Sequence, residues 1–348
     1  PSSALLNINL GQCYFELGQI EPAIESYQRA IEIKPECAEA YFYIGMLLKD
    51  KGELEAAIEH YQKVIQIDPN SAAAYNNMGV VLRDIGNPDS AIKHLKQALN
   101  LDPNCAETYN NMGNSFSDKG NHEAAIKNYQ QAIKINPDHA DALANLGFSQ
   151  RDSGDLNAAI KSYKKALDLD PNYIVSHFNM AMALREQGDL DGAIESYKRA
   201  IHIDPNCADA YNNLGNIYKE GGDLDCATEH YQTAIKLNPV LFSAHNNLGI
   251  SLERQGKTDA AVTSFKQANK LDPENASVRH ILAALTGQQT ASAPNDFVEG
   301  LFDSYAAQFD QSLVEKLKYN VPKLIAKLVL KYQSVAPLGS IMDLGCGT

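Results

Sequence analysis

Prolines recur through this chain at a constant interval of 34 residues. They are Pro1, Pro35, Pro69, Pro103, Pro137, Pro171, Pro205, Pro239 and Pro273. Glycines keep the same interval at Gly18, Gly52, Gly86, Gly120, Gly154, Gly188, Gly222 and Gly256. Alanines keep it at Ala23, Ala57, Ala91, Ala125, Ala159, Ala193, Ala227 and Ala261. Because three unrelated residue types share one period, the chain is predicted to be an array of like units that bury their apolar faces against one another.

Each recurring residue has a physical task in a pair of helices. The mid-repeat glycine ends one helix in a left-handed turn. The alanine lets two helices approach closely, and the proline stops the second helix. Apolar residues recur between these marks at helical spacing, in the third unit as Tyr75, Met78, Val81, Leu82, Ala91, Leu95 and Ala98. The pattern therefore predicts an all-α chain of helical hairpins.

The recurring residues resemble the tetratricopeptide repeat over residues 4 to about 275. The first unit shows the pattern as Leu10, Gly11, Tyr14, Ala23, Tyr27, Ala30 and Pro35. Later units depart from it at Ala181, Val64 and Leu95 without breaking the hairpin. The repeats are predicted at 4–37, 38–71, 72–105, 106–139, 140–173, 174–207, 208–241 and 242–275. The resemblance implies a right-handed superhelix (an α-solenoid) of eight repeats, whose first helices line a concave groove for a peptide or partner protein.

Two further segments follow the repeats. Val278, Ile281, Leu282 and Leu285 make 276–287 an amphipathic stretch, which is expected to form a helix that caps the last apolar face. The small, polar stretch 288–295 is expected to be a linker. At the other end, Pro1 stands where a preceding unit would finish, so another repeat is expected upstream.

The sixth position of the repeat carries asparagine in every unit but one. These residues are Asn9, Asn77, Asn111, Asn145, Asn179, Asn213 and Asn247, with Tyr43 as the exception. Positions two, six, nine and thirteen lie opposite the face that packs inward, so the carboxamides are expected to run along the groove. A carboxamide can both donate to and accept from a peptide backbone. The row is similar to the asparagine ladder of the O-GlcNAc transferase superhelix; the alternative, that asparagine here serves local packing, stays open.

Charged rows accompany the asparagines. Position twelve supplies Lys49, Arg83, Arg151, Arg185 and Lys219. Position thirteen supplies Glu16, Asp50, Asp84, Asp118, Asp152, Glu186 and Glu220, and position two adds Glu39, Glu107, Asp141 and Asp209. A solvated surface of mutually paired charges is favoured over a dedicated site for a charged ligand. Because position two is never basic, the groove is not expected to clamp an acidic C-terminal tail, as co-chaperones of this family do.

Composition argues against several classes of ligand and location. The formal net charge of −13 opposes binding to the phosphate backbone of nucleic acids. No apolar run reaches the roughly eighteen residues that a membrane span needs, and no secretion leader opens the chain. The six cysteines include no C-x-x-C pair and are expected to be reduced thiols. A cytoplasmic protein is therefore expected. His60, His94 and His230 stand apart from any nucleophile, so the repeats are predicted to hold no catalytic or metal site.

The last segment departs from the repeat. Residues 340–344 are predicted to form a strand that runs into Gly345-Cys346-Gly347-Thr348, and a glycine-rich turn after a strand lets a ligand approach the backbone. Asp343-Leu-Gly-Cys-Gly-Thr resembles the first motif of class I S-adenosylmethionine-dependent methyltransferases, and residues 301–310 resemble that family's N-terminal helix. The resemblance implies that Asp343, Gly345 and Gly347 lie near the methionine end of the cofactor. A nicotinamide fingerprint or another Rossmann-like use is the less favoured alternative.

These patterns leave three functional hypotheses. The favoured one is a scaffold that binds a peptide or protein. The second is a parent S-adenosylmethionine-dependent methyltransferase whose repeats present its substrates. Segment 296–348 is then an incomplete Rossmann-like domain, which by itself binds no cofactor and catalyses nothing. The third, the repeat region of an O-GlcNAc transferase-like glycosyltransferase, depends on the asparagine row alone. The apolar faces of 296–348 are also expected to favour self-association.

Overall fold

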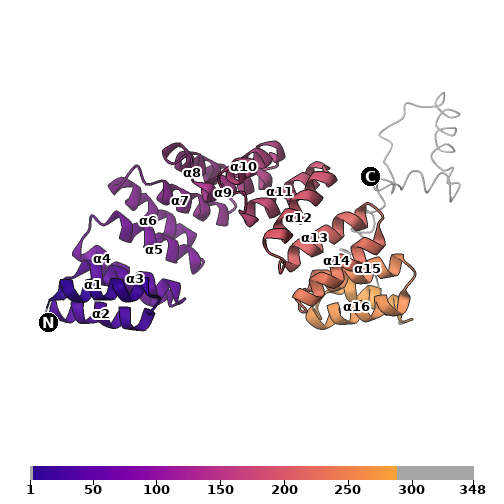
Figure 1. The fold of residues 1–348 in the computed structure, drawn as a ribbon, viewed down its shortest axis with the longest axis horizontal. Helices are drawn as coiled ribbons and strands as arrows, with labels where there is room; N and C mark the ends of the chain where they lie inside the picture. Colours follow the sequence, from indigo (N-terminus) through magenta and orange to yellow (C-terminus); the bar gives the residue numbers. More distant parts are fainter. Residues whose placement is uncertain (1–2, 288–348) are drawn as a thin grey trace, which may run out of the picture. The chain divides into compact units, whose positions relative to one another are not determined.

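The computed structural model describes residues 3–287, and every regular element in that range is an α-helix (Figure 1). In chain order these are α1 (Ala4–Glu16), α2 (Ile20–Ile33), α3 (Ala38–Asp50), α4 (Leu54–Ile67), α5 (Ala72–Asp84), α6 (Pro88–Leu101), α7 (Ala106–Asp118), α8 (His122–Ile135), α9 (Ala140–Asp152), α10 (Leu156–Leu169), α11 (Ile174–Gln187), α12 (Leu190–Ile203), α13 (Ala208–Glu220), α14 (Leu224–Leu237), α15 (Phe242–Arg254), α16 (Thr258–Leu271) and α17 (Ala276–Leu285). The all-α prediction is confirmed for the described range. The predicted strand 340–344, the linker 288–295 and the methyltransferase-like segment 296–348 lie outside it.

The chain divides into two compact units, Pro1–Ile217 and Tyr218–Thr348, with the boundary inside α13. In the first unit, α1 pairs with α2, α3 with α4, and so on to α11 with α12. Each hairpin then packs against the first helix of the next one, as α4 does against α5. The first unit is thus a stack of like hairpins, a solenoid in which each repeat contacts its neighbours.

The turn within each hairpin depends on its glycine. All eight mid-repeat glycines have φ between 70° and 90°, a region in which a side chain is strained. The second helix then begins with local help: the Asn87 side chain accepts a hydrogen bond from the Ser90 N–H, and Pro88 occupies the first turn of α6. Asp155 caps α10 in the same way, accepting from the Ala158 N–H.

The core of each hairpin contains the recurring alanines and a large residue at position twenty-four. All eight alanines are fully buried, as predicted for close helix crossings. The large residue lies against a glycine of the first helix: a Cβ placed on Gly113 would lie 2.5 Å from Cε1 of Tyr129. Glycine at position eight is therefore a space requirement in most repeats. Ala181 is the one departure and is itself fully buried.

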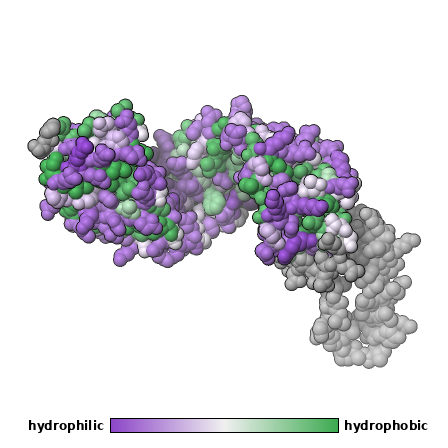
Figure 2. Space-filling view, turned by 90° about the horizontal axis from the view of Figure 1, so that it is seen from below, coloured by the Kyte–Doolittle hydropathy of each residue, from purple (hydrophilic) through white to green (hydrophobic). Residues whose placement is uncertain are grey.

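Burial at position three of the first helix was missed by reasoning from a single hairpin, and position ten was noted only in the third unit, as Val81. Ala40 and Ala74 at position three are fully buried, and Leu47 at position ten is 2% exposed. In α1, which no hairpin precedes among the described residues, Leu6 at position three is 49% exposed. Hydrophobic residues are accordingly visible at the N-terminal end, on the left in Figure 2. These positions are buried by the preceding repeat, which a single-hairpin pattern cannot show.

Among the described residues of the second unit, the hairpin is repeated and is followed by α17. In α15 and α16, Leu248 and Phe265 are buried in one cluster with Val278 of α17. Ile281, Leu282 and Leu285 pack against the same cluster. The apolar face of 276–287 thus covers that of α16.

Candidate functional site

The first helices form the inner side of the stack in the first unit. Beyond its own hairpin, α5 contacts α3 and α7, and α9 contacts α7 and α11. No comparable contact joins successive second helices within residues 3–217. Helices that approach one another on one side only define the inside of a curved stack. We call the side chains at positions two, six, nine and thirteen of α1, α3, α5, α7, α9 and α11 the inner face.

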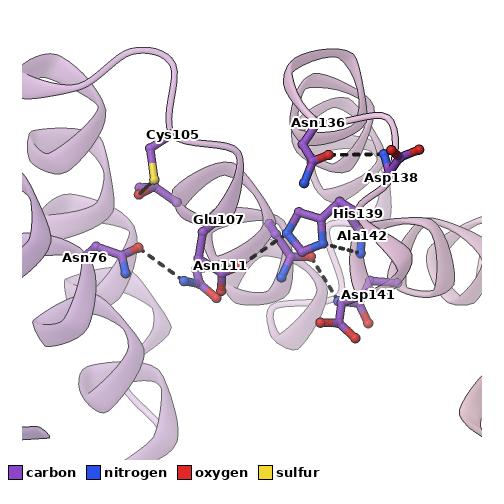
Figure 3. Close-up of polar contacts among 12 residues, drawn as sticks. Asn76, Cys105, Glu107, Asn111, Asn136, Asp138, His139, Asp141 and Ala142 are labelled. Carbon is purple, nitrogen blue, oxygen red and sulfur yellow. Dashed lines mark hydrogen bonds and ion pairs between the residues drawn. The ribbon is translucent and has the colours of Figure 1, made fainter. Parts of the chain in front are cut away.

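Asparagines of the inner face are hydrogen-bonded from one repeat to the next. The Asn111 Nδ2 donates to the Asn76 Oδ1 at 3.1 Å, as Figure 3 shows, and the Asn145 Nδ2 donates to the Asn110 Oδ1 at 3.0 Å. Each bond joins the sixth position of one first helix to the fifth position of the preceding one. The fifth-position asparagines were not singled out from the sequence, although Asn76 and Asn110 stand beside the row.

The predicted row is not uniform. Asn111 is only 7% exposed, whereas Asn9 in α1 is exposed. Asn179 is partly exposed, and its side chain has no hydrogen bond within the described residues 3–287. Asn77 and Asn213 are also partly exposed. In the second unit, the Asn247 Oδ1 accepts from the Lys219 Nζ at 3.4 Å. The position-six asparagines therefore differ from repeat to repeat in how deeply they are buried and in whether they are available to a ligand.

Tyr43, the exception in the row, is integrated into the first two repeats. Its ring stacks on that of Tyr27, with centroids 5.2 Å apart and planes 15° apart. Its hydroxyl accepts a hydrogen bond from the Gln12 Nε2 at 2.9 Å. An aromatic residue at this position thus replaces the carboxamide contact by stacking.

Arginines of position twelve pair with carboxylates of their own repeat and of the next. The Arg83 guanidinium lies 2.9 Å from the Asp84 carboxylate and 3.7 Å from that of Asp118. The Arg151 guanidinium lies 2.9 Å from the Asp152 carboxylate and 3.8 Å from that of Glu186. Each arginine therefore links two first helices and has its charge compensated.

The shorter basic side chains and Arg185 behave less uniformly. The Lys49 Nζ is 3.6 Å from the Asp50 carboxylate, and Lys219 in the second unit reaches Asn247. Arg185 also has a polar or electrostatic partner. Paired charges of this kind on a solvated surface contribute little stability, of the order of 1 kcal/mol or less.

Position two carries a second set of links, each from a first helix to the N-cap residue of the next first helix. The His139 Nε2 lies 3.2 Å from the Glu107 Oε2 (Figure 3), and the Tyr173 hydroxyl donates to the Asp141 carboxylate. The bond to Glu107 raises the pKa of His139 above its ordinary value, and the same bond lowers the pKa of Glu107. Burial, together with the bond to Asp141, raises the pKa of Tyr173. Carboxylates at position two are thus partly engaged within the chain.

Apolar side chains at position nine were undervalued in the sequence. Neither Phe148 nor Met182 was singled out as a site residue from the sequence. Phe148 is 36% exposed on the inner face, and the Arg151 guanidinium carbon lies 5.3 Å from its ring centroid. The signal was available, because position nine is polar in the fourth repeat (Asn114) and apolar in the next two.

Other predicted sites receive no test from the described residues. Asp343, Gly345 and Gly347 lie outside residues 3–287. Within that range, no group of three or more His, Cys, Asp or Glu side chains is arranged to hold a metal ion. None of the helices there is long and apolar enough to cross a membrane. The five cysteines in the range are free thiols.

Comparison with protein families decides the family. The profile described as TPR repeat matches residues 11–50, 45–86, 113–151, 181–222 and 215–256. Profiles described as tetratricopeptide repeat match 72–105, 140–173, 162–195 and 242–275. The chain belongs to the tetratricopeptide repeat family. It is a scaffold of the kind that binds peptide or protein partners. Its repeats share the hairpin core but differ in the side chains at positions six and nine.

Solved structures agree with the tetratricopeptide fold. A chain of the hetero-tetramer Cut9-Hcn1 of APC/C is 16% identical, with 76% of this chain and 52% of that chain covered and a TM-score of 0.58. PilF of Pseudomonas aeruginosa is 23% identical, with 64% and 98% covered and a TM-score of 0.54. In sequence, the chain is also similar to MamA, at 32% identity, with 48% of this chain and 97% of that chain covered and a TM-score of 0.43. A comparison with curated proteins gave no match.

Proposed function

We propose that the inner face of the first unit binds an extended segment of a partner protein through its peptide backbone. The observation that carries this proposal is the pair of neighbouring carboxamides Asn145 and Asn179. Asn145 is held in place by its bond to Asn110, and Asn179 has no hydrogen bond within residues 3–287. A fixed group beside an available one binds at a lower entropic cost than two mobile groups.

Hydrogen-bonding capacity supports recognition of the backbone. Asn145 uses one N–H toward Asn110, so its Oδ1 remains able to accept from a peptide N–H. Asn179 offers a donor and an acceptor. Packed helices lie about 8–10 Å apart, and an extended chain advances about 3.3 Å per residue. Successive carboxamides therefore match every third peptide unit of an extended ligand.

Backbone methylation tests this mode of binding. Peptides of about twelve residues, enough to cross four first helices, are selected from a random display library on the chain. They are then resynthesised and measured by fluorescence anisotropy. We expect N-methylation of one central peptide bond to weaken binding about tenfold or more, because it removes a backbone donor. Selected peptides that tolerate N-methylation at every position would contradict recognition of the backbone.

Asn179→Ala and Asn111→Ala form the matched protein variants. Asn179→Ala removes an available carboxamide and is expected to weaken the selected peptides about tenfold. Asn111→Ala removes a side chain that is 7% exposed and bonded to Asn76, so its first effect is on stability. Equal affinity in the wild-type chain and Asn179→Ala would favour local packing as the role of the row. We propose that the chain resembles the O-GlcNAc transferase superhelix only in how it binds a peptide backbone.

We also propose, from the motif around Asp343, that the repeats present bound segments to a methyltransferase domain. The support is the resemblance of Asp343-Leu-Gly-Cys-Gly-Thr to the first motif of the class I enzymes. A chain that continues this motif through a complete domain should bind S-adenosylmethionine in a calorimetric titration. Gly345→Arg should abolish that binding by filling the space beside the backbone. Lack of binding by the continued chain would leave the scaffold function alone.

A further inference from the structure

Helices α9 and α11 differ from α7 in the side chains beside their carboxamides. Position nine is Phe148 in α9 and Met182 in α11, and position two of α11 is Val175, which is 45% exposed. In α7 the same positions are Asn114 and Glu107. On the face drawn in Figure 2, hydrophobic residues are interspersed with hydrophilic ones. Phe148 and Val175 thus expose apolar surface beside the carboxamides of these two repeats, where α7 has polar side chains.

Arg151 holds the two position-nine side chains together. Its guanidinium carbon lies 5.3 Å from the Phe148 ring centroid, and its Nη1 lies 3.4 Å from the Met182 Sδ. The same guanidinium is paired with Asp152 and Glu186, which fixes it further. The Arg151 side chain is only 12% exposed, while Phe148 keeps 36% of its surface open. Arg151 thus packs against one side of the Phe148 ring, and the other part of the ring stays exposed.

The apolar position lies one helical turn from the proposed backbone contacts. Asn145 precedes Phe148 by three residues, and Asn179 precedes Met182 by three residues. Residues three apart are neighbours on a helix surface. Side chains of an extended peptide alternate in direction, so a peptide held by Asn145 and Asn179 directs one side chain toward Phe148 and Met182 and the next one away from them.

Charge on this part of the inner face favours a basic ligand. At positions two and thirteen of the inner face, and at the adjoining position twelve, α5, α7, α9 and α11 together carry six carboxylates and three guanidinium groups. The carboxylates are Asp84, Glu107, Asp118, Asp141, Asp152 and Glu186, and the guanidinium groups are Arg83, Arg151 and Arg185. The formal net charge of the whole chain, −13, is also negative. An acidic surface attracts cationic partners and repels anionic ones.

We propose that repeats five and six form a side-chain-binding position that selects an extended peptide with one large apolar residue flanked by lysine or arginine. The apolar side chain contacts Phe148 and Met182, and the cationic side chains approach the surrounding carboxylates. The inference rests on the proposed function, because the carboxamides of Asn145 and Asn179 set the register of the peptide. Phe148 and Met182 then determine which residue that register accepts.

A display selection with three protein variants tests the proposal. Random peptides of about twelve residues are selected on the wild-type chain, on Phe148→Ala and on Met182→Ala. The matched control is Met46→Ala, which makes the same change at position nine of the second repeat. We expect wild-type selections to be enriched in Phe, Tyr, Leu or Met with neighbouring Lys or Arg. We expect the enrichment in large apolar residues to be lost with Phe148→Ala and with Met182→Ala and retained with Met46→Ala.

Resynthesised peptides give the quantitative outcome. Phe148→Ala should weaken the best peptide about tenfold or more, as loss of an aromatic anchor does, and Ala in place of the apolar peptide residue should weaken it similarly. Acidic consensus peptides, or equal affinity for the wild-type chain and Phe148→Ala, would overturn the inference. If, in that case, Asn179→Ala nevertheless abolishes binding, the chain binds the peptide backbone as proposed but has no side-chain-binding position at Phe148 and Met182. If no peptide is enriched, both proposals fail. Circular dichroism of each variant confirms that it is folded.

Discussion

Helices α7 and α11 occupy equivalent places in two repeats of the first unit, yet they present different surfaces. In α7, Asn111 is buried and bonded to Asn76, and Glu107 is bonded to His139. In α11, Val175 is 45% exposed, and Asn179 has no hydrogen bond within residues 3–287. The recurring alanines behind both helices are equally buried. The recurring residues therefore determine the hairpin core. The inner face differs between repeats: in α7 it is polar and its side chains are hydrogen-bonded, and in α11 it is more apolar and more available to a ligand.

The largest expected effect is at position eight of the hairpin core, where α7 has Gly113 and α11 has Ala181. Gly113→Val in α7 introduces a Cβ that would lie 2.5 Å from the Tyr129 ring, so we expect a loss of about 3 kcal/mol in the free energy of unfolding. Ala181→Gly in α11 creates no clash and should cost about 1 kcal/mol through helix propensity. Urea unfolding followed by circular dichroism measures both. Equal losses would mean that the tyrosine does not restrict position eight.

The second expected effect distinguishes Asn111, whose carboxamide is hydrogen-bonded, from Asn179, whose carboxamide is not hydrogen-bonded within the described residues. Asn111→Ala removes a side chain that is 7% exposed and leaves the half-buried acceptor of Asn76 without its donor, so we expect a loss of about 2 kcal/mol in the free energy of unfolding. Asn179→Ala removes no hydrogen bond within the described residues and should change stability by less than about 0.5 kcal/mol. Both variants are compared by urea unfolding. Equal destabilisation would make the two repeats equivalent and remove the contrast between α7 and α11.

The same contrast shows what could be predicted from the sequence. The period, the glycine turns and the buried alanines follow from residues that act within one hairpin, and all were predicted correctly. Burial of Ala40 and Ala74 depends on the preceding repeat, which lies beyond a single-hairpin pattern. Whether Asn111 or Asn179 is available depends on which side chain stands at position five of the preceding first helix. Asn76 precedes Asn111, whereas Ala144 stands at that position before Asn179.

A smaller effect compares the tyrosines behind α7 and α9. The Tyr129 hydroxyl donates to the Asn114 Oδ1 at 2.8 Å, whereas the buried Tyr163 hydroxyl has no partner among the described residues. Tyr129→Phe should therefore cost about 1 kcal/mol in the free energy of unfolding, and Tyr163→Phe close to nothing. Phe265 occupies the same position in the last repeat, so a phenyl ring fits there. Equal costs in urea unfolding would show that the bond to Asn114 adds no stability.

The smallest expected effect is the pH dependence of the link between Glu107 and His139. The pKa of His139 is raised above 6.5, so its contribution to stability is complete below that pH and is lost as the pH rises through the folded value. The pKa of Glu107 is lowered below 4.5, so its contribution is present above that pH and is lost on acidification. Both groups are charged between these limits, at about pH 5.5. The pair should therefore stabilise the contact between α7 and α9 most strongly there.

Comparison of wild type with His139→Gln measures this contribution. The free energy of unfolding should differ by less than about 1 kcal/mol at about pH 5.5, because Glu107 is 58% exposed, and by less still at about pH 8. Protonation also removes the acceptor that Nδ1 offers to the Ala142 N–H, but that contact, at 3.5 Å, is too long to outweigh the ion pair. Tyr173→Phe is the matched control, since it removes the equivalent link to Asp141 in the next repeat. Burial and the bond to Asp141 raise the pKa of Tyr173, so its hydroxyl stays protonated over this interval and the effect of Tyr173→Phe should be constant. A constant difference for His139→Gln would show that the link acts as a neutral hydrogen bond, and the hydrogen-bonded surface of α7 would then be independent of pH.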